Sequence, residues 1–494
     1  MAEDQELREH RLKKLQSLRE KGIDPFAIER YERTHTAQQI ISDFEKLEEK
    51  EVSIAGRIVS LRIMGKATFA HIQDESGRIQ IYIRLDAVGP EQYSLIEYID
   101  IGDFLGIKGK VGKTRMGEIT VFTDKMQILA KSLRPIPIGK QKGEEQWYSL
   151  QDIEQRYRQR YLDLIINPDV RDVMLKRTII IKAIRDFLGN EGFIEVETPV
   201  LQAIAGGAAA RPFKTHYNAL DCDFFLRISL ELYLKRVIIG GFEKVYEMGR
   251  VFRNEGLSTR HNPEFTLLEL YQAYANLEDI MDLVERMFCY ISEQLYGGLT
   301  FTYQGNTINL ARPWRRLPLL EGIRQYAGIE PEELESFESA KRAGERLGLQ
   351  LDKEENLGGI IEKIHEKFVQ PNLIQPTFIT DYPIETSPLA KKRQDNPRLA
   401  RRFEPYIGTQ ECGNAFSEIN DPLDQRERFL YQAKMRAAGD EEAHPMDEDF
   451  LLAMEYGMPP TGGLGIGIDR LTMLFTDSPS IRDVILFPQL RPQK

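Results

Sequence analysis

Between residues 52 and 129, apolar and polar positions alternate in short runs that are separated by turn residues. The run at residues 77–85 shows this best, because Ile or Leu occupies every second position from 79 to 85 and polar residues lie between them. The runs that predict strands span residues 52–61, 67–74, 77–85, 103–111 and 117–124. Five short strands within about 80 residues predict a small closed β-barrel.

Helical spacing governs the chain before and after this region. Residues 1–22 carry leucines at helical spacing and end at a glycine, which predicts an N-terminal helix. Residues 174–192 predict a long helix and residues 193–201 a strand that follows it. The pattern of residues 319–368 is helical and charged, which predicts an insertion between strand-rich parts.

These patterns predict an α+β protein in two domains. Residues 1–132 are expected to form the N-terminal helix and the five-stranded barrel. Residues 133–149 are rich in Pro, Gly and charge and predict a linker. Residues 150–494 form the second domain, built on an antiparallel sheet with flanking helices. The length of 494 residues agrees with more than one core.

Composition narrows the function only partly. Three cysteines lie far apart, the N-terminal residues lack an apolar signal core, and no run of about 18 apolar residues occurs. We therefore expect a cytoplasmic protein without a membrane span. The net charge of −11 disfavours a general nucleic-acid binder, although six basic residues lie between Arg8 and Lys21. Such a stretch on a helix is more often only a solvated face.

The segment RVFRNEGLSTRHNPEFT at residues 250–266 places basic, acidic and aromatic residues between strand-like runs. By strand parity, the residues on one face before the loop are Gly249, Val251, Arg253 and Glu255, and those after it are Phe265, Leu267, Glu269 and Tyr271. We predict a hairpin that brings a guanidinium, carboxylates and an aromatic ring onto one surface. Such a surface is suited to a polyphosphate and a base.

Glycines at 463, 465 and 467 strip side chains from one face of a predicted strand, and Arg470 then opens a helix. A flat ligand can lie on such a backbone, although structural glycines at a sheet bend are the alternative. Glu404 and Glu411 lie between the two regions and are natural oxygen ligands for magnesium that carries phosphates. Alone, two glutamates seven positions apart are usually structural.

The polar face of the third predicted barrel strand combines Arg78, Gln80 and Tyr82, and Phe69 lies on the strand before it. Aromatic, amide and guanidinium groups of this kind stack on and hydrogen-bond single-stranded bases. A solvated strand face is an equally good interpretation of these residues alone.

Three motifs in the right order resemble those of class II aminoacyl-tRNA synthetases. They are GFIEVETPVL at 192–201, with Pro199 as its proline, FRNEGLSTRHNPEFT at 252–266 and GLGIGIDRLTMLF at 463–475. Together with the barrel they match the subclass that charges Lys, Asp or Asn. The resemblance implies that the barrel of residues 1–132 is an anticodon-binding domain of the OB type and that residues 150–494 are the class II catalytic domain. The whole chain most closely resembles the bacterial lysyl-tRNA synthetase family. The resemblance implies ATP-dependent attachment of L-lysine to tRNA(Lys) through a lysyl adenylate, with release of pyrophosphate and AMP.

The resemblance also implies an ATP site. Arg253 matches the motif-two arginine that holds the α-phosphate and the amino acid carboxylate, and Arg470 matches the motif-three arginine on the γ-phosphate. The other positions that match the ATP site, where Phe265 stacks on adenine, are Glu255, His261, Phe265 and Glu411. Glu404 and Glu411 match the carboxylates that hold Mg²⁺.

Lysine, anticodon and dimer contacts are implied in the same way. The lysine-pocket positions are Gly207, Glu231, Arg253, Glu269, Tyr271, Asn414, Phe416 and Glu418. The barrel positions that match anticodon contacts are Phe69, Gln80 and Glu118. The resemblance implies a homodimer through the motif-one region, whose apolar residues are Ile194, Val196 and Val200.

Two departures and several rivals accompany this interpretation. Leu230 stands where the family commonly has proline, and the linker at 138–147 is longer than usual. An aspartyl or asparaginyl enzyme would need extra cations where Glu231, Glu269 and Glu418 are expected to converge. A relative that lysylates a protein would lack the barrel, and an inactive RNA-binding paralogue would not need both motif arginines. Class I synthetases are excluded because neither HIGH nor KMSKS occurs.

Overall fold

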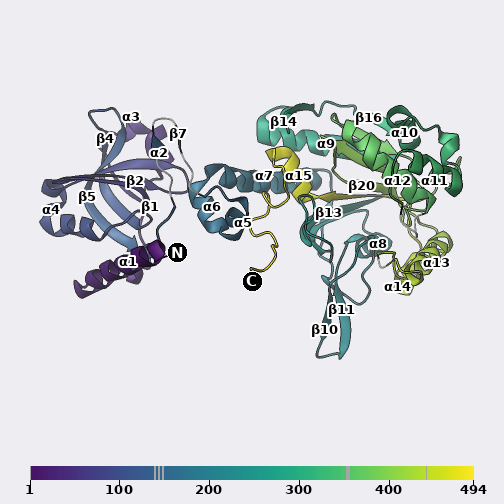
Figure 1. The fold of residues 1–494 in the computed structure, drawn as a ribbon, viewed down its shortest axis with the longest axis horizontal. Helices are drawn as coiled ribbons and strands as arrows, with labels where there is room; N and C mark the ends of the chain where they lie inside the picture. The colour runs from purple at the N-terminus through teal and green to yellow at the C-terminus, as the bar shows by residue number, and fades with distance from the viewer. Residues whose placement is uncertain are drawn as a thin grey trace. The chain divides into compact units, whose positions relative to one another are not determined.

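The computed structural model describes residues 2–137, 141–142, 145–146, 150–351, 356–440 and 442–493. The chain divides into two units, Met1–Asp152 and Ile153–Lys494, which are drawn in Figure 1. Residues 138–140, 143–144 and 147–149 of the predicted linker lie outside the described residues. The short strands β6 (Gln141–Lys142) and β7 (Glu145–Gln146) pair within it. Among the described residues, no helix has the length and apolar character needed to cross a membrane.

The first unit contains the predicted barrel. Its strands are β1 (Glu51–Met64), β2 (Ala67–Gln73), β3 (Arg78–Arg84), β4 (Phe104–Lys113) and β5 (Ile119–Ala130). They close in the order β1-β2-β3-β5-β4, which confirms the barrel. Ile79, Ile81 and Ile83 are buried as the alternation predicts. Leu85 differs, because the chain leaves the strand at Arg84 and Leu85 begins helix α4 (Leu85–Ser94) with an acidic residue in its first turn.

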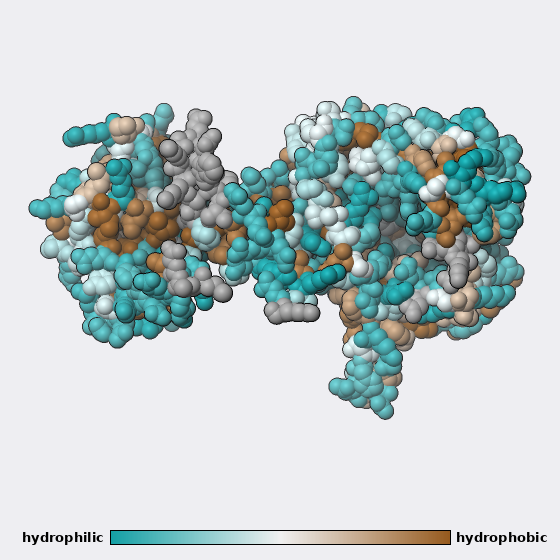
Figure 2. Space-filling model, in the orientation of Figure 1, coloured by the Kyte–Doolittle hydropathy of each residue, from teal (hydrophilic) through white to brown (hydrophobic). Residues whose placement is uncertain are grey.

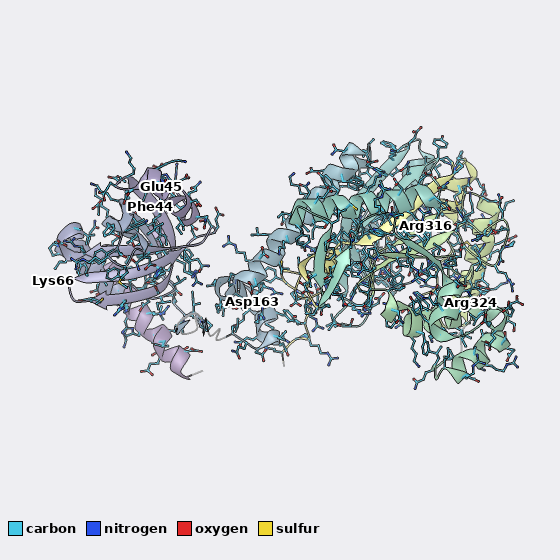
Figure 3. The ribbon with its side chains drawn as sticks, turned by 90° about the horizontal axis from the view of Figure 1, so that it is seen from above. Phe44, Glu45, Lys66, Asp163, Arg316 and Arg324 are labelled. Carbon is cyan, nitrogen blue, oxygen red and sulfur yellow. The ribbon has the colours of Figure 1, made fainter. Side chains whose placement is uncertain are left out.

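Helix α1 (Ala2–Glu20) is fixed to this unit by two of its basic residues. Arg11 donates to three main-chain carbonyls, including that of Ser132 at 2.8 Å, and Lys14 pairs with Asp100 at 2.7 Å. Part of the basic stretch is therefore structural and not only a solvated face. The short helices α2 (Ala37–Ser42) and α3 (Phe44–Leu47) also belong to this unit, and Figure 3 labels Phe44 on α3.

The second unit is built on a mostly antiparallel sheet. Its strand order is β16-β17-β18-β20-β21-β13-β12-β8, with β19 paired to β18. The strands are β8 (Ile194–Glu195), β12 (Lys244–Phe252), β13 (Glu264–Ala273), β16 (Arg315–Pro318), β17 (Thr377–Thr380), β18 (Arg402–Ile407), β19 (Gln410–Glu411), β20 (Asn414–Ser417) and β21 (Thr461–Gly467). This arrangement confirms the predicted class of fold.

Three helices bury one face of this sheet. They are α7 (Pro168–Asn190), α9 (Leu277–Tyr296) and α15 (Ile468–Thr476). Apolar residues of these helices form one hydrophobic core with the sheet residues Leu268, Leu464 and Phe403. The alternating residues of the same strands therefore point to the opposite face, where polar side chains are free to gather.

Further helices surround this sheet. They are α5 (Ile153–Arg158), α6 (Arg160–Ile166), α8 (Glu231–Ile239), α10 (Leu319–Ala327), α11 (Phe337–Arg346), α12 (Leu357–Ile364), α13 (Pro422–Ala437) and α14 (Glu448–Glu455). Asp163 on α6, labelled in Figure 3, pairs with the buried Arg160 at 2.6 Å. Arg160 in turn donates to the carbonyls of Arg482 and Leu486, which ties the C-terminal segment to α6.

Smaller sheets complete the unit. Strands β9 (Leu201–Gln202), β10 (Lys214–Tyr217) and β11 (Cys222–Leu226) form one sheet, and β14 (Thr300–Tyr303) pairs with β15 (Asn306–Asn309). The β10–β11 hairpin projects from the body of this unit in Figure 1, and its surface is mostly hydrophilic in Figure 2.

The strand predicted at residues 193–201 is much shorter than expected. Ile194–Glu195 pairs in parallel with β12, and Leu201 belongs to the separate strand β9, which pairs with β11. Beyond β8, the main-chain N–H of Thr198 donates to the Glu247 side chain at 3.0 Å, and Pro199 has no N–H to donate. A side-chain acceptor and a proline thus end the pairing that the alternation alone would continue.

Candidate active site

A cavity of about 610 Å³ lies on the face of the sheet opposite to α7, α9 and α15. Three neighbouring strands form its floor, because Glu269 on β13 pairs with Gly465 on β21, which pairs with Asn414 on β20. Two residues away, Tyr271, Gly463 and Phe416 repeat the pattern. The floor therefore has a bare main-chain centre with functional side chains on both sides.

A glycine is sterically required at position 463 of this floor. A Cβ atom on Gly463 would overlap Glu418 Oε1 and would lie 2.6 Å from Tyr271 Cε1. On Gly467 the nearest atom would be 3.9 Å away, in ordinary contact distance. The predicted face without side chains thus exists. At Gly463 the space that a side chain would need is filled by Glu418 and Tyr271.

Every residue predicted for the substrate sites of this unit lines the cavity, with the exception of Glu404. The lining residues are Gly207, Glu231, Arg253, Glu255, His261, Phe265, Glu269, Tyr271, Glu411, Asn414, Phe416, Glu418 and Arg470. They come from β12–β13, from β19–β21, from α8 and α15, and from the loops between these elements. The cavity brings together segments more than 200 residues apart in the sequence.

The predicted strand position of Arg253 and Glu255 is wrong, because β12 ends at Phe252. The Arg253 N–H still donates to the Pro263 carbonyl at 2.8 Å, but the Asn254 N–H turns to the Arg211 carbonyl at 2.7 Å. The chain therefore leaves the sheet at this point, and Glu255 reaches the cavity from a loop.

Cationic groups gather at one end of the cavity. The Arg253 guanidinium lies 5.1 Å from the centre of the Phe265 ring and donates to the Ile228 carbonyl at 3.3 Å. Arg470 pairs with Glu411 at 2.9 Å, and its other terminal nitrogen is 3.3 Å from His261 Nε2. Burial and the charge of Arg470 lower the pKa of His261, so its ring is neutral near pH 7. Arginines held this way suit phosphate oxygens.

Carboxylates gather at the other end. Glu231, Glu269 and Glu418 are each at most 5% exposed. Burial, and then repulsion from Glu231, raises the pKa of Glu269 to about 7. Burial likewise raises the pKa of Glu418 to about 8. A cationic group that enters this end would favour the ionised forms of these acids.

Lys235 is a buried cation that the sequence did not reveal. It lies one turn after Glu231 on α8, and its Nζ is 2.5 Å from both Glu231 Oε1 and Glu418 Oε2. The ion-pair partner of Glu418 within the protein is therefore a lysine. The four-residue spacing of Glu231 and Lys235 on a helix was the available signal.

Leu230 stands where the family commonly has proline, and its main-chain N–H makes a hydrogen bond that a proline could not make. The Leu230 N–H donates to Glu269 Oε1 at 3.3 Å, and the Ser229 hydroxyl donates to the same oxygen at 2.8 Å. The departure adds a donor to a buried carboxylate and does not disturb the cavity.

Glu404 lies behind the cavity in a dense set of donors. Its Oε2 accepts from the hydroxyls of Tyr382 at 2.7 Å and Tyr406 at 2.8 Å, and Arg402 donates to its Oε1 at 2.6 Å. Glu411 pairs with Tyr406 across β18 and β19, so the two carboxylates are neighbours. No group of three or more potential metal ligands occurs among the described residues. A pair of carboxylates nevertheless fits Mg²⁺ that brings its remaining oxygen ligands with a phosphate.

The predicted barrel residues also lie together. Phe69 stacks on Tyr82 with ring centres 4.3 Å apart. Gln80, predicted on an exposed face, is buried under its partners. Glu118 accepts from its amide nitrogen at 2.6 Å, and Thr120 donates to its amide oxygen at 2.7 Å. Its amide is thus oriented before any ligand binds.

Comparisons with known proteins identify both units. The family described as tRNA synthetases class II (D, K and N) matches residues 152–491. The chain belongs to the class II tRNA synthetases. A family described as OB-fold nucleic acid binding domain matches residues 52–129, in the barrel of the first unit.

Relatives that align with nearly the whole chain are named lysine--tRNA ligase. The lysine--tRNA ligase of Pelotomaculum thermopropionicum is 57% identical over 99% of this chain and 96% of its own length. Those of Moorella thermoacetica and Carboxydothermus hydrogenoformans are 56% and 55% identical, over 98% and 99% of this chain and 97% and 100% of their own lengths.

Proposed function

We propose that the chain attaches L-lysine to tRNA(Lys) in two steps through a lysyl adenylate. The observation that carries the proposal is the division of one cavity into an arginine end and a carboxylate end. The arginine end suits a polyphosphate, and the carboxylate end suits a substrate with two ammonium groups. The name shared by the full-length relatives supports the same substrate.

In the first step, a carboxylate oxygen of lysine attacks the α-phosphorus of ATP, and the bond to pyrophosphate breaks. The nucleophile is already ionised, so the step needs position and charge stabilisation and no general base. Arg253 belongs to the arginine end, and there it would hold both the lysine carboxylate and the α-phosphate. Arg470 holds the γ-phosphate, and Phe265 stacks on adenine beside the clamp residues Glu255 and His261.

Magnesium would be held by Glu404 and Glu411 together with phosphate oxygens, and it would supply charge neutralisation to the leaving pyrophosphate. Arg402, Tyr382 and Tyr406 fix the Glu404 carboxylate in one orientation. Burial and the charge of Glu404 raise the pKa of Glu411, and the Arg470 guanidinium offsets part of this rise.

Lysine is selected at the carboxylate end. Its ε-ammonium is placed beside Glu418 and the Tyr271 hydroxyl, and its backbone atoms lie over Gly463 and Gly465. An aspartate or asparagine side chain would instead bring a carboxylate or a neutral amide to Glu231, Glu269 and Glu418, and the negative charge that Lys235 alone does not balance would stay without a cation. In the second step a ribose hydroxyl of tRNA attacks the adenylate carbonyl and AMP leaves, while the barrel binds the anticodon.

The defining experiment is ATP–pyrophosphate exchange across the twenty amino acids. Wild type is expected to exchange with lysine alone, and Arg253→Ala is expected to lose at least about 100-fold in exchange rate, since the charge on the reacting phosphate loses its donor. Circular dichroism serves as the control for folding. Exchange driven by aspartate or asparagine, or full exchange by folded Arg253→Ala, would contradict the proposal.

Gly463→Ala tests the floor of the lysine site. The new methyl group overlaps Glu418 Oε1 and crowds Tyr271, so we expect the KM for lysine to rise by about tenfold or more, with a smaller change for ATP. Gly467→Ala is the matched control on the same strand, because its methyl group meets nothing closer than 3.9 Å. Equal lysine KM values for the two variants would count against this placement of the substrate.

Phe69→Ala tests the barrel as an anticodon site. The loss of one stacking surface is expected to cost about 1–3 kcal/mol of tRNA binding. The KM for tRNA rises accordingly, and lysine-dependent pyrophosphate exchange stays at the wild-type rate because it does not need tRNA contacts on the barrel. Unchanged aminoacylation kinetics would show that the Phe69–Tyr82 stack serves only the fold.

We also propose that two copies pair through the motif-one region. Ile194 is 51% exposed and Val200 is 40% exposed, and Leu175 and Ile179 of α7 are exposed as well. Val196 contributes less, because it packs against an internal cluster. Light scattering at assay concentration should give twice the chain mass, and Ile194→Asp should lower it. A fully active monomer would refute the dimer.

A further inference from the structure

Lys235 is a fully buried ammonium group in contact with two acids of the cavity. It is 0% exposed and lies 2.5 Å from Glu231 Oε1 and 2.5 Å from Glu418 Oε2. The Tyr271 ring centre is 5.9 Å from its Nζ. A buried cation is retained only where partners compensate its desolvation, so this contact is a built feature of the fold.

Glu418 uses only one of its oxygens on Lys235. Its other oxygen, Oε1, is buried against Gly463, and no hydrogen-bond donor among the described residues reaches it. An acceptor of this kind needs a donor from outside the protein. Since Glu418 and Gly463 both line the cavity, Oε1 lies where a bound ammonium group would reach it.

Other charged and titratable groups face the pair from several elements. Glu269 and Tyr271 of β13 act on Glu418, and Lys391 lies near it from the loop before β18. His444 lies near Lys235, and burial together with this lysine lowers the pKa of His444 to about 4. Lys235 is therefore charged beside a neutral histidine, and its pKa is raised by Glu231 and Glu418 against burial.

The charges balance a diammonium substrate. With all three acids ionised, Glu231, Glu269 and Glu418 carry three negative charges and Lys235 one positive charge, which leaves two negative charges. Lysine presents two ammonium groups to this end when Arg253 holds its carboxylate. Without Lys235 one negative charge would be in surplus, and two buried carboxylates would face each other without a cation.

We propose that Lys235 is a positioning residue for amino acid selection, which holds Glu231 and Glu418 in place and leaves Glu418 Oε1 for the substrate's ε-ammonium. The inference rests on the proposed lysine activity. Lys235 does not touch the substrate and acts through the two carboxylates. Its loss lets one acid take up a proton or turn away, which removes an acceptor from the ammonium group.

The test compares Lys235→Met with Arg236→Met in lysine-dependent pyrophosphate exchange. Methionine keeps the length and loses the charge, so we expect the lysine KM to rise about tenfold or more, with the KM for ATP within about twofold of wild type. Arg236 is the matched control, because it is the next residue on α8 and pairs with Asp447 at 3.1 Å outside the cavity. Arg236→Met is expected to keep the wild-type lysine KM.

The pH profile separates positioning from a loss of stability. Ammonium binding needs ionised Glu418, whose pKa burial raises to about 8 while Lys235 lowers it. In wild type, kcat/KM for lysine therefore rises with pH and levels above about pH 8. In Lys235→Met this rise is displaced to higher pH, because the positive charge that lowers the pKa of Glu418 has been removed. A general loss of stability would reduce the amount of active enzyme without moving this profile.

A double variant keeps the test decisive if Lys235→Met does not fold. Glu418→Gln alone is compared with Glu418→Gln combined with Lys235→Met, in which one buried acid and the cation are removed together and only the contact of Lys235 with Glu231 is newly lost. Because Glu418 no longer supplies a carboxylate for Lys235 to hold, the second substitution is expected to raise the lysine KM by less than about threefold, the part that passes through Glu231. A further loss of about tenfold or more, as large as that expected for Lys235→Met alone, would show that Lys235 acts independently of Glu418 and would overturn the inference.

The outcomes also distinguish the two proposals. Wild-type exchange that does not depend on lysine overturns the proposed function. Wild-type exchange with lysine, combined with a folded Lys235→Met of unchanged lysine KM and unchanged pH profile, overturns only the role of Lys235.

Discussion

Burying carboxylates is the constraint on which the catalytic unit depends. Glu231, Glu269, Glu404 and Glu418 are all less than 9% exposed, and an ionised carboxylate without partners costs several kcal/mol in such surroundings. Each acid therefore has its own compensation: an ammonium group for Glu231 and Glu418, a hydroxyl and a main-chain N–H for Glu269, and two phenols with a guanidinium for Glu404. Lys235 lies on α8, Arg402 and Tyr406 lie on β18, and the other donors lie in the connecting segments beside these elements. The acids are therefore held before substrate arrives.

The sheet provides both the rigidity and the division of labour. Alternate residues of β13 and β21 face a core made with α7, α9 and α15, and the residues between them face the cavity. Leu268 and Glu269 are neighbours in sequence, yet Leu268 is packed among helices and Glu269 lines the cavity. The packing that stabilises the unit thus fixes the geometry of the site, because the same backbone carries both sets of side chains.

Much of this could be predicted from the sequence, since period-two alternation encodes the barrel strands and the glycine spacing encodes the bare face of β21. Motif resemblance located the cavity residues. What could not be predicted depends on contacts between distant segments. The early end of β12 needs the Arg211 carbonyl, the short β8 needs the Glu247 side chain, and the burial of Gln80 needs Glu118. Lys235 joins Glu231 to an acid 187 positions after it, which no local pattern reports.

The glycines of β21 have a consequence for how this enzyme can change. The centre of the cavity floor is peptide backbone whose N–H and C=O groups are already committed to β13 and β20. Substitution at these positions can only add bulk, so the floor offers no route to a new preference. A shift in amino acid choice has to come from the walls, through α8 and the segment after β20. Glu231 and Glu418 share the single cation Lys235, so a change at one of them also affects the other. A change in amino acid preference therefore requires several coordinated substitutions.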